Sequence, residues 1–116
     1  MRFLLQVYFN GAQTRLAELP EAERQAVTDE YVAFFGGPAV RDGNQLQPPA
    51  TALTVRVVDG EAIAAPGPVT ATAEPLGGYY LVEAPDIDAA VALAGRVPAA
   101  RMGGAVEVRP VVAREP

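Results

Sequence analysis

The sequence predicts an α+β fold in which one antiparallel sheet carries two helices on one face. Three observations lead to this prediction: short segments of alternating apolar residues, two segments of helical periodicity, and turn residues between them. In chain order the segments are strand, helix, hairpin, strand, helix and strand, which is a split β-α-β arrangement with an extra hairpin. The 116 residues fit one domain, which we expect to span residues 1–116.

The first strand is expected over residues 2–9, because side chains of different character alternate there with a period of two. After a polar link, Pro20 opens a helix whose acidic first turn suits the positive end of the helix dipole. Gly36 and Gly37, followed by a proline, end this helix. One apolar stripe of the helix is expected to lie on the sheet: Val27, Tyr31, Phe34 and Phe35.

The middle of the chain is expected to hold a hairpin between two irregular segments. Residues 39–51 are predicted to be a loop with a short edge strand before Leu46. The hairpin is the clearest local pattern, because Asp59-Gly60 separates two strand-like runs and both turn positions need positive φ. Residues 65–75 contain three prolines and are expected to be irregular. The two strand-like runs cover residues 54–58 and 61–64.

The last part of the chain is expected to form a strand, a helix and a strand. The first of these strands covers residues 79–83, and Asp86 is placed to cap the helix that follows. Gly95 or Pro98 ends that helix, and the last strand covers residues 105–109. A narrow stripe of this helix is predicted to pack closely on the sheet: Ile87, Ala90, Val91 and Ala94.

Two helices on one face leave the other face of the sheet to be covered. Leu4, Tyr8 and one member of the Tyr79–Tyr80 pair are expected on that second face, together with valines of the hairpin. A second copy of the chain covers such a surface most economically, with two sheets packed face to face. We therefore predict a homodimer.

Composition excludes several classes of function. The chain has no cysteine and no histidine, which argues against transition-metal sites, thiol nucleophiles and Ser-His-Asp triads, so we expect neither a metal nor a cofactor. The net charge is -5 and the nine arginines are scattered, which argues against nucleic acid. No apolar run approaches the roughly 20 residues that span a bilayer, and we expect a cytoplasmic protein without membrane partners.

Three segments stand out by their order and spacing. They are Leu46-Gln47-Pro48-Pro49-Ala50-Thr51 with Thr54-Val55-Arg56, Leu76-Gly77-Gly78-Tyr79-Tyr80-Leu81-Val82-Glu83, and Gly103-Gly104-Ala105-Val106-Glu107-Val108-Arg109-Pro110. Together they resemble the YCII-related family, in its Asp-Gly-Pro-Phe (DGPF) branch, over nearly the whole chain. The resemblance implies a ferredoxin-like protomer that pairs into a dimeric α+β barrel.

The chain departs from that branch at its signature. Pro66-Gly67-Pro68-Val69 stands where the branch has Asp-Gly-Pro-Phe, and uncharged residues replace one glutamate and a lysine of the segment that follows. Gly67, Pro68, Thr72 and Glu74 match the branch, so its turn geometry is expected to survive while its charge network is not. Some relatives resemble enzymes that use a His-Asp pair, which a chain without histidine cannot form.

Two charged residues are the first candidates for chemistry. Glu74 is the remaining acid of the signature segment, and in a partly buried loop it would serve as a general base; the alternative is a solvated loop acid or a partner of an arginine. Arg109 would clamp the carboxylate of a ligand. The alternative for Arg109 is a cross-strand ion pair with Glu107 or Glu83.

Gln47 and Tyr79 complete the predicted ligand-binding residues. Gln47 is retained beside two prolines in a segment that carries the resemblance. Tyr79 offers a phenol with an apolar body and a polar tip, which suits a pocket and equally suits a core or an interface.

Three hypotheses of function remain open. The first is a binding protein for a small polar or aromatic metabolite, with a pocket between the sheet and residues 46–51 and 66–74. The second is a cofactor-free acid–base enzyme, of lyase or isomerase type, which would depend on Glu74. The third comes from the resemblance alone, which implies an accessory protein linked to an extracytoplasmic-function sigma factor.

Overall fold

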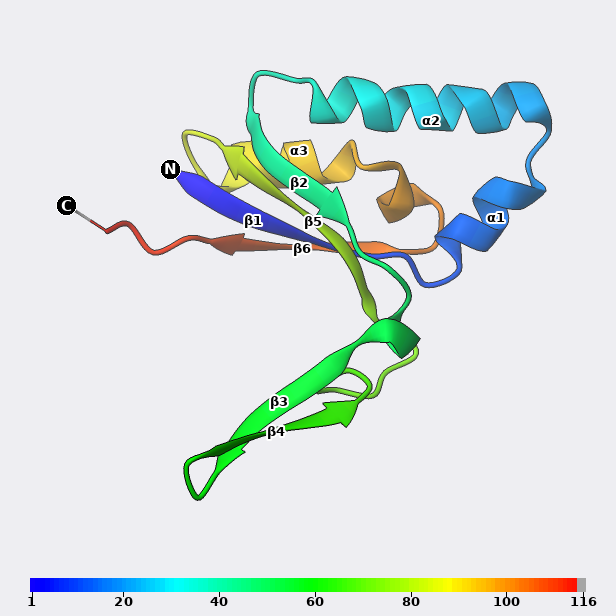
Figure 1. The fold of residues 1–116 in the computed structure, drawn as a ribbon. Helices are drawn as coiled ribbons and strands as arrows, with labels where there is room; N and C mark the ends of the chain where they lie inside the picture. The colour runs from blue at the N-terminus through cyan, green and yellow to red at the C-terminus, as the bar shows by residue number, and fades with distance from the viewer. Residues whose placement is uncertain (115–116) are drawn as a thin grey trace.

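The computed structural model describes residues 1–114 and confirms the α+β class with an extra hairpin (Figure 1). Two 3₁₀ turns, Pro49–Thr51 and Pro98–Arg101, lie in the connections. None of the helices in the described residues is long and apolar enough to cross a membrane. The helices and strands are β1 (Arg2–Tyr8), α1 (Ala12–Glu18), α2 (Glu21–Phe35), β2 (Val40–Gln45), β3 (Leu53–Val58), β4 (Glu61–Pro66), β5 (Leu76–Glu83), α3 (Ile87–Gly95) and β6 (Ala105–Pro110).

Four of the strands form one antiparallel sheet in the order β2-β5-β1-β6. β5 lies beside β1 and separates it from β2, and β1 separates β5 from β6, so the sheet consists of two interleaved split β-α-β units. Helices α2 and α3 lie on the same face of this sheet (Figure 1). This is the ferredoxin-like arrangement that the sequence predicts.

The core lies between this face and the helices. Alternation along β1 buries Phe3, Leu5 and Val7 completely or nearly so, while Leu4, Gln6 and Tyr8 stay half-buried. From α2, the ring of Phe34 packs edge-on against Tyr80 of β5, with 4.8 Å between ring centroids. From α3, two alanines are buried, and their small size lets this helix approach the sheet closely.

Two details of the helices differ from the sequence prediction. Phe35 is 51 % exposed, because consecutive residues of a helix lie about 100° apart and the sheet takes Phe34 instead. In α3 only Ala90 and Ala94 of the predicted stripe are buried against the sheet, since Ile87 and Val91 are exposed.

Residues 12–18, predicted to be a polar link, form helix α1. Gly11, with φ of 83°, turns the chain after β1, and Ala12 is the buried residue of the helix. Arg15 of α1 donates a hydrogen bond from its guanidinium to the carbonyl of Met102 at 2.5 Å, which ties α1 to the chain before β6. This helix closes one end of the space between α2 and the sheet (Figure 1).

Strands β3 and β4 form a separate hairpin that extends away from the four-stranded sheet, here called the hairpin arm (Figure 1). Its turn is the predicted one: Asp59 and Gly60 have φ of 51° and 81°. Every residue of β4 is exposed, and Thr54 is the one buried residue of β3. The arm gives the chain a radius of gyration of 16.3 Å, against roughly 13 Å for a compact domain of this length.

Candidate functional site

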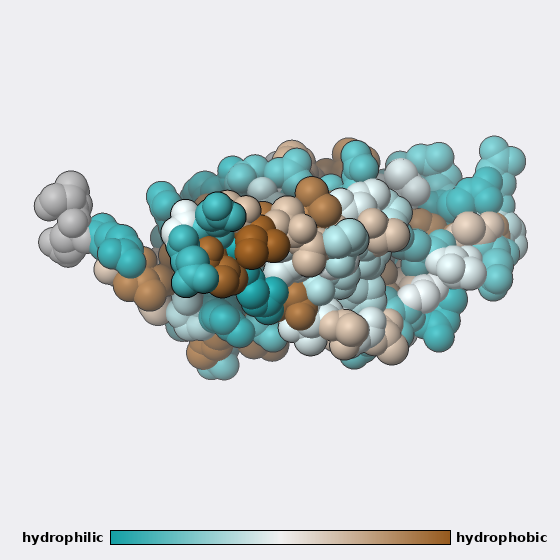
Figure 2. Space-filling model, turned by 60° about the horizontal axis from the view of Figure 1, so that its bottom comes forward, coloured by the Kyte–Doolittle hydropathy of each residue, from teal (hydrophilic) through white to brown (hydrophobic). Residues whose placement is uncertain are grey.

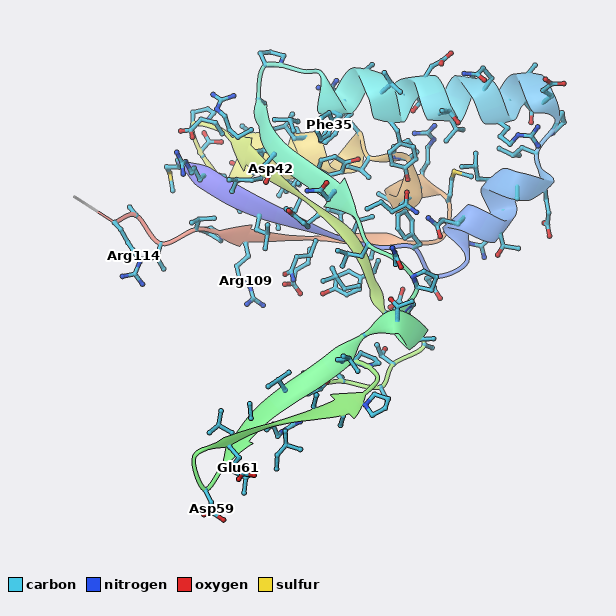
Figure 3. The ribbon with its side chains drawn as sticks, in the orientation of Figure 1. Phe35, Asp42, Asp59, Glu61, Arg109 and Arg114 are labelled. Carbon is cyan, nitrogen blue, oxygen red and sulfur yellow. The ribbon has the colours of Figure 1, made fainter. Side chains whose placement is uncertain are left out.

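The face of the sheet opposite the helices, here called the open face, carries no helix of residues 1–114 and lies on the same side as the hairpin arm (Figures 1 and 3). Strand pairing places Leu4 of β1 beside Leu81 of β5, and Gln6 beside Tyr79. These four side chains are half-buried, in contrast to the complete burial on the other face. Tyr80 packs against Phe34 of α2, and its neighbour Tyr79 therefore points to the open face. The predicted division of this pair between the two faces is present.

A hollow of about 950 Å³ lies where the hairpin arm joins the sheet. Loops at the base of the arm form one wall, and the end of β1 with the start of β6 forms the other. We call this the acidic hollow, because two glutamates and no arginine line it within the described residues. Its polar side chains are Tyr8, Gln47, Glu74 and Glu107, together with the hydroxyls of Thr51, Thr70 and Thr72.

The base of the arm is held by hydrogen bonds that the local sequence explains. The Thr54 hydroxyl donates to the Gly67 carbonyl at 2.7 Å, and the Gly67 amide donates to Ala52 at 2.8 Å. Gly67 has φ of 99°, a conformation that favours glycine. Just before β3, the Thr51 hydroxyl donates to the Pro48 carbonyl at 2.7 Å and closes the 3₁₀ turn. The retained Gly67 of the signature segment therefore has a structural role in positioning the hollow.

Gln47 and Glu74 both line the acidic hollow, one from each loop. Their placement agrees with the pocket that the sequence predicts between residues 46–51 and 66–74. The amide of Glu74 donates to the Thr72 hydroxyl at 3.1 Å, which orders the loop just before β5. The side chain of Glu74 is exposed in the single chain, so its predicted role as a general base stays a prediction.

Arg109 forms an ion pair with Glu107, as one alternative predicted, but within its own strand and not across strands. Its guanidinium Nη2 lies 3.0 Å from Oε2 of Glu107, two residues away on β6 and on the same face. The Arg109 side chain is 70 % exposed and projects toward the side of the hairpin arm (Figure 3). Arg109 does not line the hollow itself, but it holds a carboxylate that does. Its remaining donors stay directed to the open face, where a ligand carboxylate would have to lie.

Glu83, the other predicted partner of Arg109, is engaged at the far end of the open face. Its carboxylate accepts a hydrogen bond from the amino group of Met1 at 2.8 Å and lies 3.9 Å from Nε of Arg2. The hydrogen bond from the Met1 amino group holds the pKa of Glu83 below its usual value. β1 lies between β5 and β6, so Arg109 and Glu83 are not neighbours.

Tyr79 lies on the open face outside the acidic hollow. Its hydroxyl accepts a hydrogen bond from Nδ2 of Asn44 at 3.0 Å, across the β5–β2 pair. Among the predicted residues, Gln47 and Glu74 therefore line the same hollow. Arg109 lies outside it and is paired with Glu107, which lines it. Tyr79 lies on the same face, away from the hollow. Tyr8 lines the hollow but was not predicted as a site residue. The sequence does place it on this face, because it is four residues from Leu4 on the same strand.

The acidic hollow suits a small molecule that donates hydrogen bonds. Two carboxylates, the carboxamide of Gln47 and the phenol of Tyr8 offer acceptors on both walls. No group of histidine, cysteine, aspartate and glutamate side chains in residues 1–114 is arranged to hold a metal ion. The two carboxylates of the hollow can bind a ligand or transfer a proton.

Comparison with known proteins gives one assignment. A family model described as YCII-related domain matches residues 1–114, almost the entire chain. The chain therefore belongs to the YCII-related family. No curated protein matches the sequence. Its place in the DGPF branch stays a prediction based on the signature segment.

Proposed function

We propose that this member of the YCII-related family is a homodimer that binds a small, hydrogen-bond-donating metabolite in the acidic hollow. The observation that carries the proposal is the position of the hollow between two surfaces that the single chain leaves uncovered, the open face and the hairpin arm. A second copy covers both surfaces at once and separates the hollow from solvent.

The hairpin arm gives the strongest argument for a second copy. Cross-strand pairing puts six apolar residues on one face of the arm and none of its charged residues. This apolar face is exposed in the single chain, with Val57 at 70 % and Leu53 at 67 %. A two-stranded hairpin alone is marginally stable in water, so the arm needs a packing partner. The six residues are Leu53, Val55, Val57, Ala62, Ala64 and Pro66.

Apolar side chains are visible on the surface when the bottom of the view in Figure 1, where the hairpin arm lies, is turned toward the viewer (Figure 2). The open face offers a complementary surface, since Leu4, Tyr8 and Leu81 are half-buried there. When both surfaces belong to one chain, a two-fold axis brings the arm of each copy to the sheet of the other. This arrangement is the dimeric α+β barrel that the family resemblance implies.

The charge of the acidic hollow defines the ligand class. Glu74 and Glu107 favour molecules with amino groups or several hydroxyls, because carboxylates are strong acceptors and a cover from a second copy would strengthen these bonds. The volume of about 950 Å³ lies at the upper end of ordinary small-molecule pockets, so a metabolite fits with water around it.

The presence of two carboxylates in one hollow supports a second candidate, the acid–base enzyme. Glu74 is its expected base, with Glu107 held in place by Arg109. Replacing Glu74 by Gln would keep the shape of the side chain and abolish turnover of the bound metabolite. Unchanged turnover would exclude Glu74 as the base. The link to a sigma factor stays a prediction from the resemblance.

Native mass spectrometry of the freshly purified protein tests the proposal, because one spectrum reports the number of chains and any retained molecule. We expect two chains with excess mass, and loss of that mass in Glu74→Gln and Gln47→Ala. Gln25→Ala, a change to an exposed glutamine of α2 outside the hollow, is the control and should retain the mass. A single chain, or excess mass that survives both hollow variants, would contradict the proposal.

A further inference from the structure

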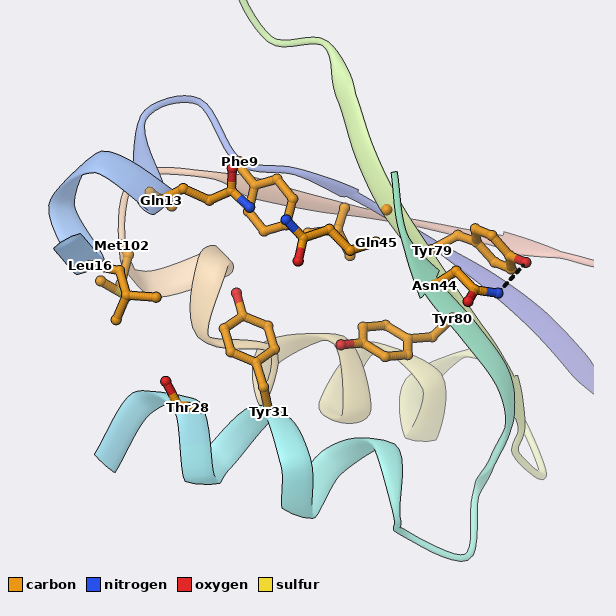
Figure 4. A pocket seen from close by; sticks show the side chains of 13 residues that line it. Phe9, Gln13, Leu16, Thr28, Tyr31, Asn44, Gln45, Tyr79, Tyr80 and Met102 are labelled. Carbon is orange, nitrogen blue, oxygen red and sulfur yellow. Dashed lines mark hydrogen bonds between the residues drawn. The ribbon is translucent and has the colours of Figure 1, made fainter. Parts of the chain in front are cut away.

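We propose that a second cavity, on the helix side of the sheet, binds an uncharged molecule with one planar ring. This tyrosine cavity of about 240 Å³ lies between α1, α2 and the end of the sheet where β2 pairs with β5 (Figure 4). It is on the opposite face of the sheet from the acidic hollow and shares no lining residue with it. The inference is therefore independent of the proposed function.

Two glycines allow aromatic rings that line the tyrosine cavity to pack directly against the backbone of the sheet. A Cβ atom added at Gly43 would lie 2.5 Å from the ring of Tyr80, so that ring rests directly on the backbone of β2. A Cβ atom added at Gly77 would lie 2.2 Å from the ring of Phe9, which rests in the same way on β5. Both rings line the cavity and offer flat surfaces on which a planar ring packs.

The opposite side of the cavity is apolar and adaptable. Leu16 of α1 and Met102 before β6 face Tyr31 across it (Figure 4). The unbranched side chain of Met102 can adjust to the outline of a ligand. Helix α1 thus has a role that its short, polar sequence does not suggest.

Polar groups in the cavity are available to a ligand. The Tyr31 hydroxyl accepts a hydrogen bond from the amide of Ala99 at 3.1 Å, which leaves its own proton to donate. Gln13 and Gln45 each bring a donor and an acceptor, and Tyr80 brings a second hydroxyl. No dashed line in Figure 4 joins these side chains to one another, and both glutamines are exposed, so a ligand at the mouth of the cavity can reach their amides.

The charge of the lining selects an uncharged ligand. No Asp, Glu or Arg side chain of the described residues lines the cavity, so an ionised ligand would lose its hydration without gaining a counter-charge. The two tyrosines stay neutral well into the alkaline range, because burial raises the pKa of both Tyr31 and Tyr80. The cavity therefore offers hydrogen bonds without charge.

Three probes of the same shape test this inference: benzamide, which is neutral, benzoate, which is an anion, and benzamidine, which is a cation. The readout is the chemical shift of the side-chain amides of Gln13 and Gln45 by NMR during titration. We expect benzamide to shift both amides and to bind at least about tenfold more tightly than either ion. Benzamide that leaves both amides unchanged, or benzoate or benzamidine that binds equally well, would overturn the inference.

Variants separate recognition from packing. Tyr80→Phe keeps the ring that packs on Phe34 and removes only the hydroxyl, and Gln45→Ala removes an amide from the wall. Each is expected to weaken benzamide binding about threefold or more while the protein stays folded. Gln25→Ala is the matched control, because its amide bonds to Asp29 at 2.9 Å outside the cavity. If Gln25→Ala weakens benzamide binding as much as Gln45→Ala, the site is not the tyrosine cavity.

Discussion

The two faces of the four-stranded sheet differ in what covers them. On the helix face, Phe3, Leu5 and Val82 are 0 % exposed. On the open face, Leu4 and Leu81 alternate with these same residues and remain half-buried. A strand with apolar side chains on both of its faces needs other residues packed against both faces. This chain supplies one cover itself, and its hairpin arm, with one apolar face exposed, is the element best suited to supply the other to a second copy.

Truncating one residue on each face gives the largest expected contrast. Phe3→Ala opens a cavity in the core and should lower the free energy of unfolding by about 3–5 kcal/mol. Leu4→Ala should cost less, and its effect should shrink as the protein is diluted below the dissociation constant of the proposed dimer, because separated chains no longer share this contact. Urea unfolding at two protein concentrations measures both. Equal, concentration-independent costs would mean that the two faces do not differ in this way.

Removing one hydroxyl on each face sharpens the comparison. Tyr31→Phe leaves the amide of Ala99 without its acceptor in a partly buried place, and should destabilise the protein by about 1–3 kcal/mol. Tyr79→Phe removes an exposed bond with Asn44, and should cost less than about 1 kcal/mol in the separated chain. Thermal unfolding of both variants measures the difference. A larger loss of stability in Tyr79→Phe than in Tyr31→Phe would contradict the difference in burial between the two faces.

Alkaline titration tests the helix face alone. Burial raises the pKa of Tyr31 and Tyr80 above 10.0, so the folded chain keeps these protons at pH values where the unfolded chain loses them. Their contribution to stability is therefore full below pH 10.0 and is lost as the pH rises through the folded pKa values. Ultraviolet absorbance of tyrosinate should show late titration that Tyr80→Phe diminishes. A titration curve unchanged by Tyr80→Phe would contradict this.

The smallest expected effect lies at the exposed edge of the open face. The Met1 amino group lowers the pKa of Glu83 below 4.5, so the stabilisation is present above that pH and is lost as the pH falls through the folded pKa. Because the pair is exposed, salt should weaken it. Carboxyl NMR titration should show the Glu83 pKa rising after the amino group is acetylated. No change on acetylation would assign the shift to another cause.

Much of the fold follows from local patterns in the sequence. Alternation predicts β1, β5 and β6, and Asp59-Gly60 predicts the hairpin turn, because these depend on neighbours in the chain. The predicted cap of α3 is also present, with Asp86 accepting a hydrogen bond from the amide of Ala89 at 2.8 Å. Helix α1 was missed, since seven residues with one buried alanine show no periodic stripe.

The sites were harder to predict because they depend on contacts between distant segments. Gln47 and Glu74 were predicted to flank one pocket, and they line one hollow. The arrangement of Tyr8 and Glu107 around them depends on how the hairpin arm meets β1 and β6, which no local pattern encodes. The tyrosine cavity has the same origin, since it needs an unpredicted helix and two glycines that lie beneath aromatic rings.

Sedimentation equilibrium of the wild-type chain and two matched variants tests the central claim, that a second copy covers the arm and the open face. The wild type should sediment with twice the mass of the 12.1 kDa chain at micromolar concentration. Val57→Arg, on the apolar face of the arm, should give the single-chain mass, and Val32→Arg, equally exposed on α2, should remain dimeric. A wild type with the mass of one chain, or a Val57→Arg variant that stays dimeric, would contradict the account.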